Sequence, residues 1–141
     1  MEISVVDASK YFKGLLLLIR KDHKVTDIEY AVMTRIGKRL GFEKEFCDNA
    51  IQEILGNRFI EDTPPEFSSR ELAMMFIKDG LTVGFCDHDE IDHKEWKWLK
   101  SVAEKNAIEL SLLSDEMEQA RARKGVTEQL EVDGITVTHS I

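Results

Sequence analysis

Apolar side chains recur at helical spacing along most of this chain. Within residues 26–40 the apolar positions stand three or four apart, which is the stripe of an amphipathic helix, and residues 92–106 repeat the same stripe. The pattern predicts helices over residues 5–20, 26–40, 43–56, 69–86, 92–106 and 111–123. The first and the fourth of these are apolar around most of their circumference, so we expect them to run through the centre of a bundle.

Three of the predicted helices begin with a capping signature. The segments 26–29, 68–71 and 92–95 each open with Ser, Thr or Asp and close with Glu, and each has an apolar residue on either side. In a capping box the first side chain accepts a hydrogen bond from the backbone of the last residue, and the Glu carboxylate accepts one from the backbone of the first. We therefore expect Thr26, Ser68 and Asp92 to cap the start of these three helices.

Two of these starts are related by a constant offset. Glu95 lies 66 positions after Glu29, and the same offset pairs Gly80 with Gly14 and matches apolar positions along both segments. The chain is therefore expected to be all-α, a compact bundle of about six or more helices built from two three-helix repeats. A glycine inside a helix costs about 1 kcal/mol relative to alanine, so the paired glycines indicate a close crossing of the two central helices.

The last part of the chain has a different pattern. Residues 130–132 and 135–137 alternate in a way typical of strands, and they flank Asp133 and Gly134, a two-residue turn signal. We expect residues 1–124 to form the helical domain and residues 125–141 to form a tail, either a short β-hairpin or an extended segment. A hairpin of this size is marginal alone and needs to dock on the bundle or on a partner.

Charge and composition narrow the class of partner. The 141 residues carry a formal charge of −8, which disfavours nucleic acid and favours cations or basic protein surfaces. The longest apolar run, 14–19, is far too short for a membrane span, and no signal peptide is visible, so direct membrane insertion is not expected. Cys47 and Cys86 lack metal-ligand spacing and are expected to be buried thiols of a cytoplasmic protein.

The junction before the fifth helix concentrates the ionisable side chains. Residues 87–95 hold five carboxylates and two histidines. Carboxylate oxygens suit Ca²⁺ or Mg²⁺, whereas imidazole nitrogens favour Zn²⁺ and similar ions. The same residues are also explained as helix caps and a solvated acidic loop, because acidic groups are favoured at helix N-termini. The run does not match an EF-hand, since the twelfth position counted from Asp87 is Trp98 rather than Glu.

Both junctions resemble a known family motif. The pattern is Asp-x-x-[Val/Ile]-[Ser/Thr/Asp]-x-x-Glu, and its matches are Asp22, Val25, Thr26 and Glu29 in the first copy and Ile91, Asp92 and Glu95 in the second, with His88 in place of the first Asp. Doubled in an all-α chain of this length, the motif resembles the TerB-like domains associated with bacterial tellurite resistance. The resemblance covers residues 5–123. It implies a two-halved helical bundle, divalent metal near the junctions, and a role as a partner of other proteins in a stress response.

The leading hypothesis is a non-enzymatic module that binds a divalent cation, with Ca²⁺, Mg²⁺ and Zn²⁺ unresolved, and contacts a protein partner. Its candidate ligands are Asp22, Glu29, Asp87, His88, Asp89 and Glu95. One alternative is a metal-dependent hydrolase that uses Asp87, His88, Asp89 and His93. Another is a ligand-free adaptor or co-chaperone-like domain that binds through the tail hairpin and an exposed Trp98. The partner is unidentified, and a homo-oligomer remains open.

Overall fold

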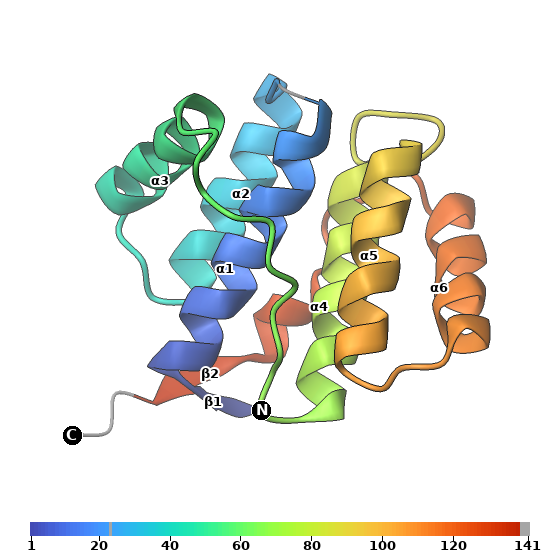
Figure 1. Cartoon of the computed structure of the whole chain (residues 1–141). Helices are drawn as coiled ribbons and strands as arrows, with labels where there is room; N and C mark the ends of the chain where they lie inside the picture. The colour runs from blue at the N-terminus through green and yellow to red at the C-terminus, as the bar shows by residue number, and fades with distance from the viewer. Residues whose placement is uncertain (23, 139–141) are drawn as a thin grey trace.

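Helices form where the apolar spacing predicts them. The computed structural model describes residues 1–22 and 24–138, and it shows an all-α bundle with one small sheet (Figure 1). The elements are β1 (Glu2–Ser4), α1 (Val5–Ile19), the 3₁₀ turn η1 (Arg20–Asp22), α2 (Asp27–Arg39), α3 (Lys44–Gly56), α4 (Arg70–Phe85), α5 (His93–Lys105), α6 (Leu110–Ala122), the 3₁₀ turn η2 (Glu131–Gly134) and β2 (Thr136–Thr138). The predicted fold class is confirmed.

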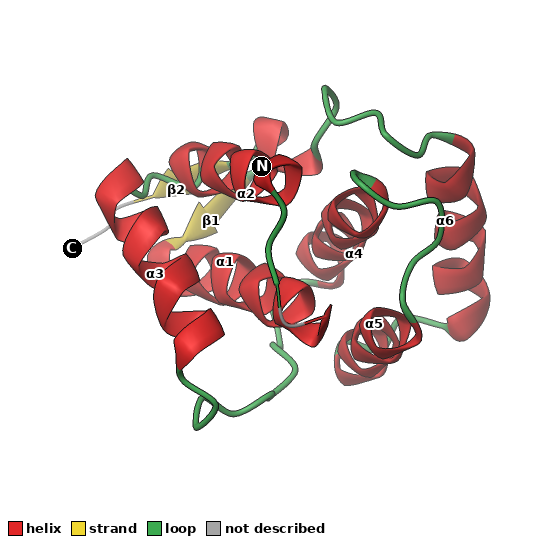
Figure 2. Ribbon diagram, turned by 90° about the horizontal axis from the view of Figure 1, so that it is seen from above, coloured by secondary structure: helices red, strands yellow, loops and turns green. Residues whose placement is uncertain are grey.

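The two halves of the bundle follow the predicted offset. Both bounds of α5 lie 66 positions after those of α2, and both bounds of α6 lie 66 positions after those of α3. The central helices α1 and α4 pack against each other, with α2 and α3 on the side of α1 and with α5 and α6 on the side of α4 (Figure 2). The largest side chains of α1 and α4, among them Tyr11 and Phe76, are fully buried.

The paired glycines allow close contact around these central helices. A Cβ atom on Gly14 would lie 2.8 Å from the ring of Phe76 in α4, and one on Gly80 would lie 3.0 Å from Leu99 in α5. Both distances are at or below the closest approach that a side chain tolerates, so alanine at either site would push a core residue aside. The helix-propensity penalty of each glycine is thus offset by packing.

Two of the three predicted capping boxes form as expected. The third does not form, because the N-cap of α4 lies one residue later than predicted. Thr26 and Asp92 cap α2 and α5, each with its reciprocal Glu. The cap of α4, however, is Ser69, whose hydroxyl accepts a hydrogen bond from the backbone of Leu72. Ser68 instead donates through its backbone and its hydroxyl to Asp7, a carboxylate in the first turn of α1 that is only 4% exposed. Asp7 is buried and needs hydrogen-bond donors, and Ser68 supplies them and therefore does not cap α4.

The expected tail hairpin does not form. The turn signal lies inside η2, and β2 pairs in parallel with the N-terminal strand β1, so that Val137 stands opposite Ile3. The cause is a distant side chain: Asp79 of α4 accepts hydrogen bonds from the backbone N–H groups of Glu131 at 2.7 Å and Val132 at 3.0 Å. These bonds hold the tail in a 3₁₀ turn against α4.

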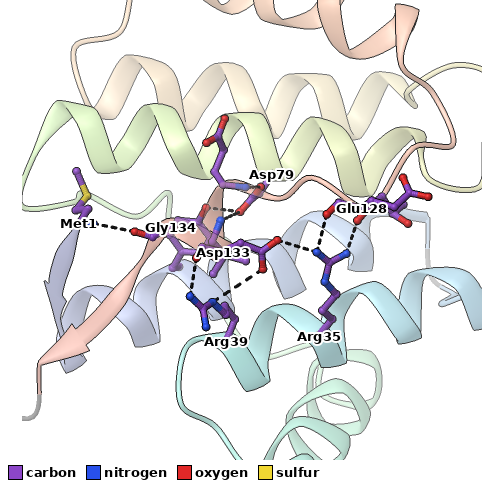
Figure 3. A network of polar contacts seen from close by, with 11 residues as sticks. Met1, Arg35, Arg39, Asp79, Glu128, Asp133 and Gly134 are labelled. Atoms are coloured by element: carbon purple, nitrogen blue, oxygen red, sulfur yellow. Dashed lines mark hydrogen bonds and ion pairs between the residues drawn. The ribbon is translucent and has the colours of Figure 1, made fainter.

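Further polar contacts hold the tail to α2 and to the N-terminus (Figure 3). Arg35 pairs with Asp133 at 2.7 Å, and Arg39 donates to the backbone carbonyl of Asp133 at 2.6 Å. The amino group of Met1 donates to the carbonyl of Gly134 at 2.8 Å. The tail also contributes three buried apolar side chains to the core, from Leu130, Val132 and Ile135. It docks on its own bundle.

Trp98, which the adaptor alternative requires at the surface, is buried. The side chain is only 4% exposed, and its indole N–H donates to the carbonyl of Gly14 at 3.2 Å, which ties α5 to α1. Cys47 and Cys86 are free, buried thiols, as predicted. Among the described residues, no helix has the length and apolar character needed to cross a membrane.

Candidate functional site

The two repeat junctions lie at the same end of the bundle. The η1 turn that precedes α2 and the loop between α4 and α5 are neighbours at the upper end of the molecule in Figure 1. The ammonium group of Lys21 in η1 stands 5.0 Å from the centre of the Trp98 ring in α5, and η1 packs against α5. The duplication therefore brings the two repeat junctions together.

Each junction buries one matched glutamate. Glu29 is 0% exposed and Glu95 is 1% exposed, which is unusual for carboxylates. One oxygen of Glu29 accepts a hydrogen bond from the backbone of Thr26 at 3.0 Å, and one oxygen of Glu95 accepts from the backbone of Asp92 at 3.2 Å. The capping boxes thus hold two equivalent carboxylates inside the protein at related positions.

The thiol of Cys86 lies in the negative field of both junctions. Its pKa is raised to about 12, first by burial and then by the negative charges of Glu29, Asp87 and Glu95. The thiol is therefore protonated at neutral pH, and carboxylates from both halves lie near enough to act on it. Cys86 is not among the site residues that the sequence predicts. Its only local signal was its position immediately before the acidic loop.

An open cleft adjoins this thiol. It has a volume of about 350 Å³ and is lined by Phe85, Cys86, Asp87, His88, Asp89, Lys124 and Gly125. Asp87 and Asp89 are exposed, and Asp89 forms an ion pair with Lys124 at 3.3 Å. His88 is half-buried. Three neighbouring candidate ligands therefore share one cleft, and a lysine partly balances their charge.

The predicted ligands do not form a complete metal cage in the described part of the chain. Among those residues, no group of three or more His, Cys, Asp or Glu side chains is arranged to hold a metal ion. The side chain of Asp22 lies outside what the structure describes. Glu29, Asp87 and Glu95 all raise the pKa of the Cys86 thiol, and Asp87, His88 and Asp89 line the cleft beside it.

The site is better suited to binding than to hydrolysis. His93, which the hydrolase alternative requires, is exposed on the first turn of α5 and does not line the cleft. The protonated thiol of Cys86 is a poor nucleophile, because the thiolate is the reactive form. The available donors are mainly carboxylate oxygens, which suit a hard cation that keeps several water ligands.

Comparison of the chain with known families, curated proteins and solved structures found no match. The resemblance to TerB-like domains therefore depends on the motif residues at the two junctions and on the doubled helical pattern.

Proposed function

We propose that this chain is a non-enzymatic, cytoplasmic TerB-like module that binds a divalent cation where its two repeats meet. In this proposal the cation-binding end also contacts a protein partner, and the module acts as an interaction scaffold in a stress response of the tellurite-resistance type. The observation that carries the proposal is the cleft that Asp87, His88 and Asp89 line beside Cys86. The negative field of Glu29 and Glu95, one from each half, acts on this thiol.

This field favours a cation for an electrostatic reason. Carboxylates gathered at one place repel one another, and burial strengthens the repulsion because the protein interior screens charge poorly. A divalent ion near Asp87 and Asp89 would relieve it. Oxygen donors and a protonated thiol favour Ca²⁺ or Mg²⁺, whereas a Zn²⁺ site needs thiolate or several imidazole ligands.

Calorimetric titration with Ca²⁺, Mg²⁺, Mn²⁺ and Zn²⁺ tests the site directly. We expect saturable binding of Ca²⁺ or Mg²⁺ at micromolar to millimolar concentration. The Asp87→Ala/Asp89→Ala variant should bind at least about tenfold more weakly, because it removes two carboxylates that line the cleft. A tenfold change corresponds to about 1.4 kcal/mol of binding free energy.

The matched control is Glu104→Ala/Glu109→Ala. It removes the same formal charge from two exposed residues, Glu104 in the last turn of α5 and Glu109 directly before α6, so it separates a local ligand effect from a change in net charge. We expect the control to bind as the wild type does. The proposal fails if no heat is released at millimolar metal, or if both double variants weaken binding equally.

A further inference from the structure

An apolar groove lies between α1 and α3. Its volume is about 340 Å³, and its apolar lining includes Phe12, Leu16, Phe42, Phe46, Ile54 and Ile60. The rings of Phe42 and Phe46 stack with their centres 4.9 Å apart, and Phe46 remains 53% exposed. Next to Ile60, the side chain of Phe59 is 82% exposed. Aromatic side chains left open to water beside an apolar groove are typical of an interaction surface.

The internal repeat shows that this groove is a feature of one half only. The groove residues Leu16, Ile54 and Ile60 correspond, at the offset of 66, to Thr82, Ala120 and Val126, which line the matching space between α4 and α6. That matching space measures only about 20 Å³, and residues that follow α6 form part of its wall. The same site is therefore closed in the second half and open in the first.

The charges on the groove favour a partner that carries both signs of charge. The ionisable side chains that line it are Lys13 from α1 and Glu53 from α3, so the two walls carry opposite charges. A strongly acidic or basic partner would meet one repulsive wall. A second copy related by a twofold axis can instead place each Lys13 beside the Glu53 of the other copy. The formal charge of −8 opposes association of two copies, and this opposition is smallest at this apolar face, where the charges of Lys13 and Glu53 cancel.

We propose that the groove between α1 and α3 binds a second copy of this chain in a symmetric dimer, with Phe59 of each copy inserted into the groove of the other. An apolar cavity of about 150 Å³ holds a benzene molecule, so a groove of about 340 Å³ accommodates a phenylalanine ring. The patch is small compared with the roughly 800 Å² per partner of stable interfaces, so we expect a dimer that dissociates in the micromolar range.

Sedimentation equilibrium over a wide concentration range tests the proposal. Wild-type protein should pass from monomer to dimer, and Phe59→Ser or Phe46→Ser should raise the dissociation constant at least tenfold. The matched control is Leu110→Ser, which removes a residue of 58% exposure from the start of α6, on the far side of the molecule (Figure 2). The control should dimerise as the wild type does, and circular dichroism checks that each variant remains folded.

Charge exchange separates a second copy from any other occupant. Lys13→Glu and Glu53→Lys should each weaken the dimer about tenfold, because like charges then face each other across the axis. The double variant Lys13→Glu/Glu53→Lys restores both pairs and should return the dissociation constant to within about threefold of the wild-type value.

Three results would overturn the proposal. They are a monomer at every concentration up to the millimolar range, equal weakening by Phe59→Ser and Leu110→Ser, and failure of the double charge exchange to restore association. A monomer that binds an apolar dye or a foreign peptide in the groove would assign the groove to another occupant.

Discussion

Between pH 7 and pH 4 the wild-type protein should gain about 2 kcal/mol of unfolding free energy relative to the Asp79→Asn variant. Burial raises the pKa of Asp79 to about 6 from an ordinary value of 3.8, although hydrogen bonds from Tyr11 and from the backbone of Glu131 and Val132 act in the opposite direction. The folded protein therefore binds a proton at this carboxyl group at a pH where the unfolded chain does not. Stability from this group is fully present below pH 3.8 and is lost as the pH rises through 6.

The groups that face Asp79 come from two elements, α1 and η2. Tyr11 of α1 donates its hydroxyl to the carboxylate at 2.6 Å, η2 supplies the two backbone donors, and the carboxylate of Glu131 adds a weaker repulsion that also raises the pKa. Asparagine removes the titration but keeps the size of the side chain. The expected difference therefore reports the ionisation of Asp79 and not a cavity.

Urea unfolding at several pH values between 4 and 7 measures this effect. The control is Asp115→Asn, which changes an exposed carboxylate on α6 and should leave the pH profile parallel to that of the wild type. If the stability of Asp79→Asn also ran parallel to that of the wild type, Asp79 would titrate alike in the folded and unfolded chains, and the raised pKa would be wrong.

The helices could be predicted because their signals are local. The boxes at Thr26 and Asp92 depend on residues only three positions apart, and the apolar stripe of each helix repeats within one or two turns. The constant offset of 66 residues allowed the same helices to be predicted in both halves of the bundle. The offset also explains why the junctions before α2 and α5 are neighbours, since equivalent junctions of two similar halves lie at the same end of the bundle.

The errors arise where a distant residue overrides a local preference. The turn signal at 133–134 favours a hairpin, but Asp79 lies more than 50 positions away and captures the backbone at the start of η2. Likewise Asp7 takes Ser68 from the predicted cap, and the carbonyl of Gly14 provides the buried partner of Trp98. Such partners have no signature near the residues that they control.

The candidate site was only partly predictable for the same reason. Glu29 and Glu95 could be selected because each belongs to a capping box, and Asp87 because it lies in a dense acidic run. Cys86 could not be selected, because its environment depends on charges that reach it from both halves of the fold. The sequence identifies the carboxylates singly, and only the packing of the two repeats shows that they share a field.

Removing the tail should unfold the bundle. If the tail were only a hairpin docked on the surface, the bundle would stay folded without it. Truncation after Lys124 removes the buried side chains of Leu130, Val132 and Ile135, each of which contributes about 1.5–3 kcal/mol of burial. It also leaves Asp79 without its backbone donors. The combined loss exceeds about 5 kcal/mol, which is comparable with the whole stability of a domain of this size.

We therefore expect the truncated chain to lose its cooperative thermal transition and its near-ultraviolet circular dichroism signal and to bind a hydrophobic dye. A matched pair of variants in the full chain locates the cause. Val132→Ala, at a site that is 0% exposed, should lower the unfolding free energy by about 2 kcal/mol, whereas Val126→Ala, at 47% exposure, should change it by less than about 0.5 kcal/mol. A truncated chain that unfolds cooperatively near the wild-type temperature would show that the six helices are stable alone. The tail would then be an accessory segment and not part of the core, and the buried position of Val132 would carry little of the stability assigned to it.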